Sequence, residues 1–282
     1  MISVHNLLPL IMVCALLLGA GCLQAQETGG SAGPTPPTGH AAMQNALGNV
    51  TGGIQSTLDR LDSTLSLASR TLGTTGISGA GADEVLSGVA NSHPAIINVI
   101  TYDQNGTVVA AEPDSAKILI GQNLRKYDIV KKTLATRQPQ MSDLLSLAEG
   151  GDGAVLAHPV FSPGKQFLGV VSSGISPYAL VTPIANQVME NTPYTYMVAQ
   201  TNGRILYDPD PQEVGKETFN ETLFADFPGI IELARHYSGN RTGYDTYSFY
   251  SSGFGKVVSK ETFWDTVGLH GTEWRVLVIS EV

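Results

Sequence analysis

Metal-ligating side chains in this sequence do not fall into known spacings. The six histidines are scattered, with no His-Glu-x-x-His or similar pattern. Asp208-Pro209-Asp210 offers the oxygen ligands that calcium prefers, but the glycine and the distal glutamate of a calcium loop are missing. An ordinary turn is therefore the favoured interpretation of this segment. The sequence predicts no metal site and no cofactor.

Catalytic motifs are also missing from the sequence. It contains no Gly-x-Ser-x-Gly elbow and no phosphate-cradling glycine loop, and its glycine clusters fall in predicted turns. Cys14 and Cys22 are the only cysteines, and both lie in the N-terminal targeting segment. The mature chain then has no thiolate nucleophile and no internal disulfide. We expect a protein that is not an enzyme. A hydrolase would need histidines and carboxylates gathered in one cleft from distant parts of the chain.

His158 has two interpretations. It precedes Pro159 in a predicted strand, where it could donate a hydrogen bond to a carboxylate of a ligand. It could equally be a core histidine whose hydrogen bonds are satisfied within the protein.

Four Asn-x-Ser/Thr sequons could accept glycans if the source organism glycosylates exported proteins. They begin at Asn49, Asn105, Asn220 and Asn240. About two such sequons are expected by chance, so the pattern is a weak signal.

Residues 1–22 are predicted to be a signal segment. Its apolar run, residues 7–18, is shorter than the roughly 20 residues that cross a bilayer. Gly19-Ala20-Gly21-Cys22 follows and is similar to a lipobox, which predicts lipidation of Cys22 and a lipid anchor on the extracytoplasmic face of the membrane. The alternative is an ordinary signal peptide cut near Ala25, which gives a secreted protein. Residues 23–40 are rich in Gly, Pro, Ser and Thr and predict a flexible linker.

The net charge of −9 argues against nucleic-acid binding, because an acidic surface repels phosphate backbones. No later stretch is apolar enough for a transmembrane helix, and the sequence stops at Val282 after a strand-like run. We therefore expect a membrane signalling or transport protein as a partner.

Residues 41–92 predict a long helix followed by a short one at 84–91. Apolar residues recur in the long helix at steps of three and four: Met43, Leu47, Val50, Ile54, Leu58, Leu61, Leu65, Ala68 and Leu72. This stripe either lies along the globular domains of its own chain, which is the favoured interpretation, or forms the seam of a homodimer.

Two later segments, residues 93–180 and 181–282, repeat one order of elements: a hairpin, a helix and three antiparallel strands. An Asn-Gly turn inside residues 103–106 is the strongest hairpin signal. In the first segment, the expected strands are 96–102, 107–111, 141–147, 154–161 and 167–176, with a helix at 125–136. After a connecting helix at 180–190, the second segment has expected strands at 195–200, 204–207, 243–250, 256–263 and 274–280, with a helix at 227–236. The predicted fold class is α+β, with two five-stranded antiparallel sheets.

Several motifs in this order resemble those of double Cache (PAS-like) extracytoplasmic sensor domains. They are Gly121-Gln122-Asn123-Leu124, Ser142-Asp143, His158-Pro159-Val160-Phe161, the run 168–176, the run 203–210, Val214-Gly215-Lys216 and the run 271–276. The resemblance covers residues 41–282. It implies a membrane-distal module at 93–180 that binds a small ligand and a membrane-proximal module at 181–282.

The resemblance also implies which residues would bind the ligand, between the first sheet and its helix. They are Arg125, Tyr127, Asp128, Ile129, Met141, Ser142, Asp143, Val155, His158, Val171 and Ser173. Members that bind α-amino acids carry an Arg and aromatic residues at the helix start, where this chain has Tyr127, Ile129 and Val130. The resemblance therefore favours a less polar or weakly acidic small molecule over an α-amino acid.

Together these features predict a sensory lipoprotein that binds a small molecule and acts through a partner membrane protein. The alternatives are a ligand-free interaction or dimerisation module at the cell surface and a solute-binding protein for a transporter.

Overall fold

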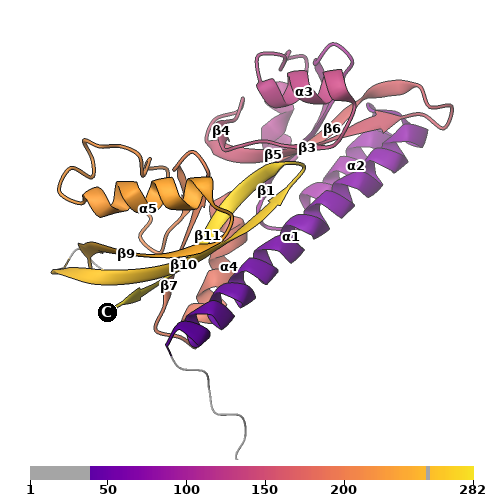
Figure 1. The fold of residues 1–282 in the computed structure, drawn as a ribbon. Helices are drawn as coiled ribbons and strands as arrows, with labels where there is room; N and C mark the ends of the chain where they lie inside the picture. The colour runs from indigo at the N-terminus through magenta and orange to yellow at the C-terminus, as the bar shows by residue number, and fades with distance from the viewer. Residues whose placement is uncertain (1–38, 252–254) are drawn as a thin grey trace, which may run out of the picture. The chain divides into compact units, whose positions relative to one another are not determined.

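The computed structural model describes residues 39–251 and 255–282. The signal segment, Cys22 and nearly all of the predicted linker lie outside these residues. The described chain is α+β, with a long N-terminal helix and two antiparallel sheets, which confirms the predicted fold class (Figure 1). Among the described helices, none is long and apolar enough to span a bilayer.

The N-terminal helix α1, His40–Thr75, forms because its apolar side chains share one face. Every member of the predicted stripe is buried, and the helix packs on β5 and β6 of the first sheet and on β10 and β11 of the second (Figure 1). The stripe therefore lies along the globular part of its own chain. Homodimerisation through this helix stays a prediction, and it would have to use a face other than the stripe.

The first module consists of the first sheet and its covering helices. Its strands are β1 (Ile96–Asp103), β2 (Val108–Glu112), β3 (Gln140–Met141), β4 (Leu145–Ser146), β5 (Asp152–Phe161) and β6 (Phe167–Ile175), in the order β2-β1-β6-β5-β3 with β4 paired to β5. A 3-10 helix η1 (Asp114–Leu119) and α3 (Asp128–Thr136) accompany it, and α2 (Ala80–Ala90) packs on β1 and β2. One face of this sheet meets α1, and the opposite face packs against η1 and α3.

The second module repeats this arrangement after the connecting helix α4 (Pro177–Met189). Its strands are β7 (Thr195–Gln200), β8 (Ile205–Tyr207), β9 (Gly243–Tyr250), β10 (Val257–Leu269) and β11 (Thr272–Glu281), in the order β8-β7-β11-β10-β9, with α5 (Pro228–Gly239) over one face. Strand by strand, this order corresponds to that of the first sheet.

The start of the helix in the first module differs from the prediction. It begins at Asp128 instead of Arg125. The side chain of Asn123 accepts a hydrogen bond from the backbone N–H of Arg125, and the guanidinium of Arg125 donates to the backbone oxygens of Gln104 and Asn105. These bonds hold residues 123–127 as a loop against the β1–β2 hairpin, because side chain–backbone bonds compete with helix formation.

The prediction of one strand at 141–147 is wrong, because the structure has two short strands there, β3 and β4. Ser142 separates them: its hydroxyl accepts a hydrogen bond from the N–H of Val155 and donates one to the backbone oxygen of Asp143. The helix η1 was not predicted either.

The strands β10 and β11 are longer than expected and meet in a two-residue turn, His270-Gly271. Both residues have positive φ, 52° and 88°, as a type I′ turn requires. The turn brings His270 to α1.

Substitutions at two glycines of α1 can test the packing of this helix on the first sheet, because the two glycines differ in their surroundings. A Cβ at Gly73 would overlap the backbone oxygen of Phe161, whereas a Cβ at Gly48 meets nothing. We expect Gly73→Ala to lower the free energy of unfolding by about 1–3 kcal/mol, and the control Gly48→Ala to raise it by about 0.5–1 kcal/mol. Urea unfolding followed by circular dichroism measures both. Equal effects would contradict the packing of α1 on β5.

Candidate functional site

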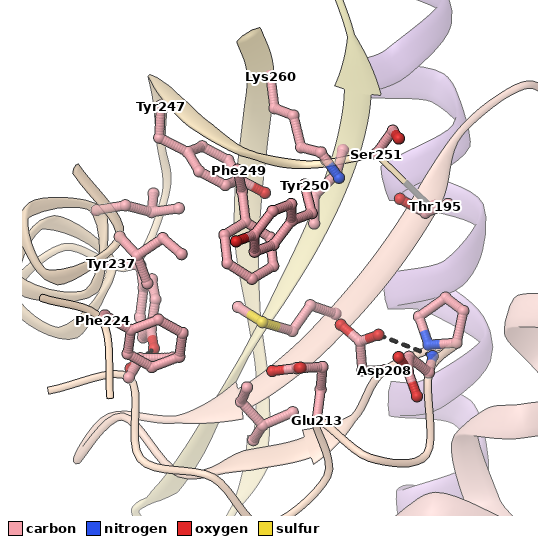
Figure 2. A pocket seen from close by; sticks show the side chains of 18 of the residues that line it. Thr195, Asp208, Glu213, Phe224, Tyr237, Tyr247, Phe249, Tyr250, Ser251 and Lys260 are labelled. Carbon is pink, nitrogen blue, oxygen red and sulfur yellow. Dashed lines mark hydrogen bonds between the residues drawn. The ribbon is translucent and has the colours of Figure 1, made fainter. Parts of the chain in front are cut away.

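A cavity of about 410 Å³ lies in the second module, between the sheet and α5. This volume falls within the range of about 300–1,000 Å³ that small-molecule sites occupy. Its walls come from β7 to β11, from α5 and from the segment that follows β8. The lining residues are Thr195, Met197, Ile205, Asp208, Pro209, Asp210, Pro211, Glu213, Thr218, Phe224, Ile230, Leu233, Tyr237, Tyr247, Phe249, Tyr250, Ser251, Lys260 and Ile279 (Figure 2).

Aromatic side chains form one wall of this cavity. Tyr247 and Phe249 stand two residues apart on β9, so both point to the same face of the sheet. Phe224 meets Phe249 edge to face, with ring centroids 6.3 Å apart, and Tyr237 comes from α5 (Figure 2). Aromatic faces carry negative potential, so this wall favours apolar and cationic groups.

Carboxylates form the opposite edge, directly after the buried strand β8. An oxygen of Asp208 accepts a hydrogen bond of 2.9 Å from the N–H of Asp210, and an oxygen of Asp210 accepts one from the N–H of Gln212. Glu213 is buried and pairs with Lys216 at 2.7 Å. The backbone turn therefore holds a group of acidic side chains at the C-terminal end of β8.

Asp208 has an unusual electrostatic environment. Burial, together with the nearby charges of Glu213 and Asp210, raises its pKa to about 7, against the lowering effects of the Asp210 N–H bond and Lys260. Close to neutral pH this carboxyl group is poised between its protonated and ionised forms. Perturbed carboxyl groups of this kind are typical of functional sites.

Lys260 is the one lysine among the residues that line the cavity. In Figure 2 it reaches in from the top of the view, whereas Asp208 and Glu213 lie at the bottom. Burial lowers the pKa of its ammonium, although the charges of Glu281 and Asp208 oppose this effect. The cavity thus has an acidic end and a basic end, and aromatic rings line one side of it.

Two tyrosines of the wall remain protonated at physiological pH. Burial raises the pKa of Tyr237 to about 12, and its hydroxyl lies 2.6 Å from that of Thr218. Burial also raises the pKa of Tyr247. Both therefore serve as neutral surfaces and hydrogen-bonding groups.

The site predicted in the first module surrounds a much smaller space, of about 40 Å³, which holds no more than a few water molecules. Of the predicted residues, the structure brings Tyr127, Ile129 and Val155 to this space. The side chains around it are mainly apolar and come from β1, β4, β5 and β6 of the sheet and from η1, α3 and the loops beside them.

The other predicted residues lie elsewhere. Arg125 is exposed and bound to the β1–β2 hairpin, Asp128 is exposed and pairs with Lys131, and Asp143 is exposed. Ser142 bridges to β5. Met141, Val171 and His158 lie on the face of the sheet that meets α1, as does Ser173, two residues after Val171 on β6, which donates to the backbone oxygen of Asn98. The structure therefore does not gather the predicted set around one space.

His158 makes its contact with the first helix. Its Nε2 lies 2.7 Å from an oxygen of Asp62, and Nε2 of His270 lies 2.7 Å from the same oxygen. Burial alone would raise the pKa of Asp62, but the hydrogen bonds and charges of the two histidines outweigh it, and the pKa is lowered. The four sequon asparagines, Asn49, Asn105, Asn220 and Asn240, are all exposed.

Sequence analysis missed the cavity of the second module. The alternating aromatics of 243–250 and the acidic segment that begins at Asp208 were its visible signals. The acids were interpreted as an ordinary turn. The turn exists, but it carries its carboxylates into a cavity.

Comparison with known proteins shows which sequences and structures this chain is similar to. Residues 56–177 match the family model described as HK/GC/Chemotaxis protein-like, sensor domain. This segment is similar to the sensor domains of that family. The match confirms the resemblance to extracytoplasmic sensors that the sequence motifs indicated, and the solved structures extend that resemblance over most of the chain.

An extracellular ligand binding receptor from Desulfohalobium retbaense is 25% identical, with a TM-score of 0.71 over 86% of this chain. The chain spans 41% of the length of that receptor. The ligand binding domain of the Pseudomonas aeruginosa amino acid chemoreceptor PctB, in complex with L-Gln, is 17% identical over 85% of this chain and 89% of its own, with a TM-score of 0.59. A methyl-accepting chemotaxis protein X is 14% identical over 86% of this chain and 97% of its own, with a TM-score of 0.65.

The last two similarities concern the fold alone. No curated protein sequence matches this chain significantly.

The raised pKa of Asp208 predicts a pH-dependent stability. Because its folded pKa lies above the ordinary value of 3.8, the group costs no stability below that pH and destabilises increasingly as the pH rises to about 7. We expect Asp208→Asn, which can still accept the Asp210 N–H bond, to raise the free energy of unfolding at pH 8 by roughly 2–4 kcal/mol, at about 1.4 kcal/mol per pKa unit.

At pH 4 the variant and the native chain should be equally stable. The exposed Asp143→Asn serves as the matched control and should show no such pH dependence. Urea unfolding at both pH values measures the difference. A gain of the same size at pH 4 and pH 8 would show that Asp208 is not held at a raised pKa.

Proposed function

We propose that this chain is an extracytoplasmic sensory lipoprotein. It would bind a small amine-bearing molecule in the second-module cavity and would not catalyse a reaction of that molecule. The observation that carries this proposal is the buried carboxyl group of Asp208 at the acidic end of an aromatic-lined cavity. Burial of a carboxylate is costly, and Lys260 offsets this cost only in part, because the pKa of Asp208 stays raised. The ammonium group of a ligand would offset the rest.

The chemistry of the cavity favours a ligand with one ammonium group. That group would pair with Asp208 and Glu213, and the aromatic wall would receive the body of the molecule. Lys260 and Ser251, at the other end, suit a carboxylate, carbonyl or hydroxyl oxygen. An amine with a polar oxygen a few bonds away matches all three regions.

The sensory part of the proposal is supported by the family match and by the solved receptor domains of similar fold. One of those, PctB, is described in complex with L-Gln, and another chemoreceptor domain, PctC, in complex with GABA. Both ligands carry an amine. A sensor must also bind its ligand differently in two conformations, because only differential affinity shifts an equilibrium.

The location of the protein and its partner are part of the same proposal. The lipobox-like end at Cys22 supports a lipid anchor on the outer face of the membrane, with the residues between Cys22 and the start of α1 as a spacer. A membrane signalling protein would then detect the liganded form. We further propose that the second module is the one nearer to the membrane.

A thermal-shift screen of small amines, carboxylic acids and neutral metabolites tests the proposal. We expect a rise in melting temperature with one or more amines, since binding to the native state stabilises it. Asp208→Asn should abolish the rise, whereas the control Asp143→Asn should leave it unchanged. A response confined to acids, or one that survives Asp208→Asn, would contradict the proposed site. No response to any compound would favour a ligand-free interaction module.

The affinity for such an amine should depend on pH, because only ionised Asp208 pairs with an ammonium group. With a pKa of about 7, the ionised fraction at pH 5 is about 1%, so the dissociation constant should rise about 100-fold between pH 8 and pH 5. Isothermal titration calorimetry at the two pH values measures the ratio. An affinity that is constant over this range would exclude Asp208 as the partner of the amine.

A further inference from the structure

Three side chains of metal-ligating type meet where α1 passes from the first sheet to the second, away from the ligand cavity. Asp62 comes from α1, His158 from β5 of the first module and His270 from the β10–β11 turn of the second. One carboxylate oxygen of Asp62 lies 2.7 Å from Nε2 of each histidine. We call this group the His–Asp–His cluster.

The ligand atoms of the cluster already lie close to a coordination geometry. All three are within 4.8 Å of one another. Around a tetrahedral zinc ion, with bonds of about 2.0–2.1 Å, neighbouring ligand atoms are about 3.3 Å apart. Small side-chain rotations would move the two nitrogens off the shared oxygen and open the central position.

The backbone around the cluster is held by hydrogen bonds of its own. Gln55 of α1 binds both the N–H and the oxygen of Gly268, two residues before His270, at 3.0 and 3.1 Å. Ser69 of α1 donates to the backbone oxygen of Pro159, next to His158. Thr272, after the turn, donates to the backbone oxygen of Met141 in the first module. These hydrogen bonds hold the backbone near the three ligand residues independently of the contacts within the cluster, as a preorganised site requires.

Burial of the cluster suits an ion with one solvent ligand. The side chain of His158 is 7% exposed, whereas those of His270 and Asp62 are 23% and 21% exposed. The buried side is closed by protein, and the open side gives a path for an ion and room for a water molecule.

We propose that Asp62, His158 and His270 bind a divalent transition-metal ion such as Zn²⁺. Two imidazole nitrogens and one carboxylate oxygen suit zinc, cobalt or nickel better than magnesium or calcium, which prefer oxygen ligands alone. Each imidazole would give the lone pair of Nε2 and carry its hydrogen on Nδ1, and water would complete the coordination. The ion would tie both modules to α1, in place of two hydrogen bonds.

The test uses Co²⁺ and Zn²⁺ with the metal-free, purified full chain. We expect one Co²⁺ per chain, with the visible absorption of a low-symmetry nitrogen–oxygen site, and a rise in melting temperature of about 4 °C or more with excess Zn²⁺. His270→Asn should weaken metal binding at least about 10-fold. Asparagine tolerates the positive φ of this position, so the turn should survive the substitution.

His236→Asn is the matched control, because His236 also pairs with a carboxylate, that of Asp245, at 2.6 Å. It should bind Co²⁺ like the native chain. Asp62→Asn provides a second ligand variant that should also lose binding. If neither metal binds, the cluster is only a hydrogen-bonded junction and the proposal fails. Binding that persists in both His270→Asn and Asp62→Asn would place the metal elsewhere and would equally overturn it.

Discussion

The burial of one stripe of α1 is the constraint on which the rest of the structure depends. A helix of 36 residues extends over about 54 Å, which is long enough to pack on both sheets. Each buried residue of the stripe removes apolar surface from water, at about 25 cal/mol per Å². The same face fixes where polar neighbours of the stripe come to lie. Asp62 follows Leu61 directly, so burial of the stripe carries its carboxylate to the junction of the two modules.

The two modules use one topology, and they differ in what fills the side of the sheet away from α1. In the first module, Leu119, Leu124 and Ile129 fill this side almost completely. In the second module, the aromatic side chains of β9 and the carboxylates that follow β8 line opposite parts of this space, and a cavity remains between them. The repeated fold therefore does not imply a repeated binding site, because a site depends on the side chains that occupy this space.

Sequence analysis predicted most of the local elements, although not η1, and missed features that depend on tertiary contacts. The helical stripe of α1 and the β1–β2 hairpin follow from periodicity and turn residues that are visible within a few residues. The break at Ser142 depends on its bond to Val155, and the start of α3 on the contact of Arg125 with the hairpin. The cavity is assembled from many elements, and the His–Asp–His cluster joins residues up to 208 positions apart, so no spacing in the sequence reveals either one.

Strand β10 physically connects the two proposed sites. Lys260 near its start lines the cavity, and the turn at its end carries His270. Its pairing with β11 is unbroken from Lys260 to Leu269, so regular strand structure joins the two sites without a bulge. A ligand at Lys260 that changed the position of this strand would therefore also change the surroundings of His270. Thermodynamic linkage then makes the effect mutual: the factor by which the ligand changes metal affinity is the factor by which the metal changes ligand affinity.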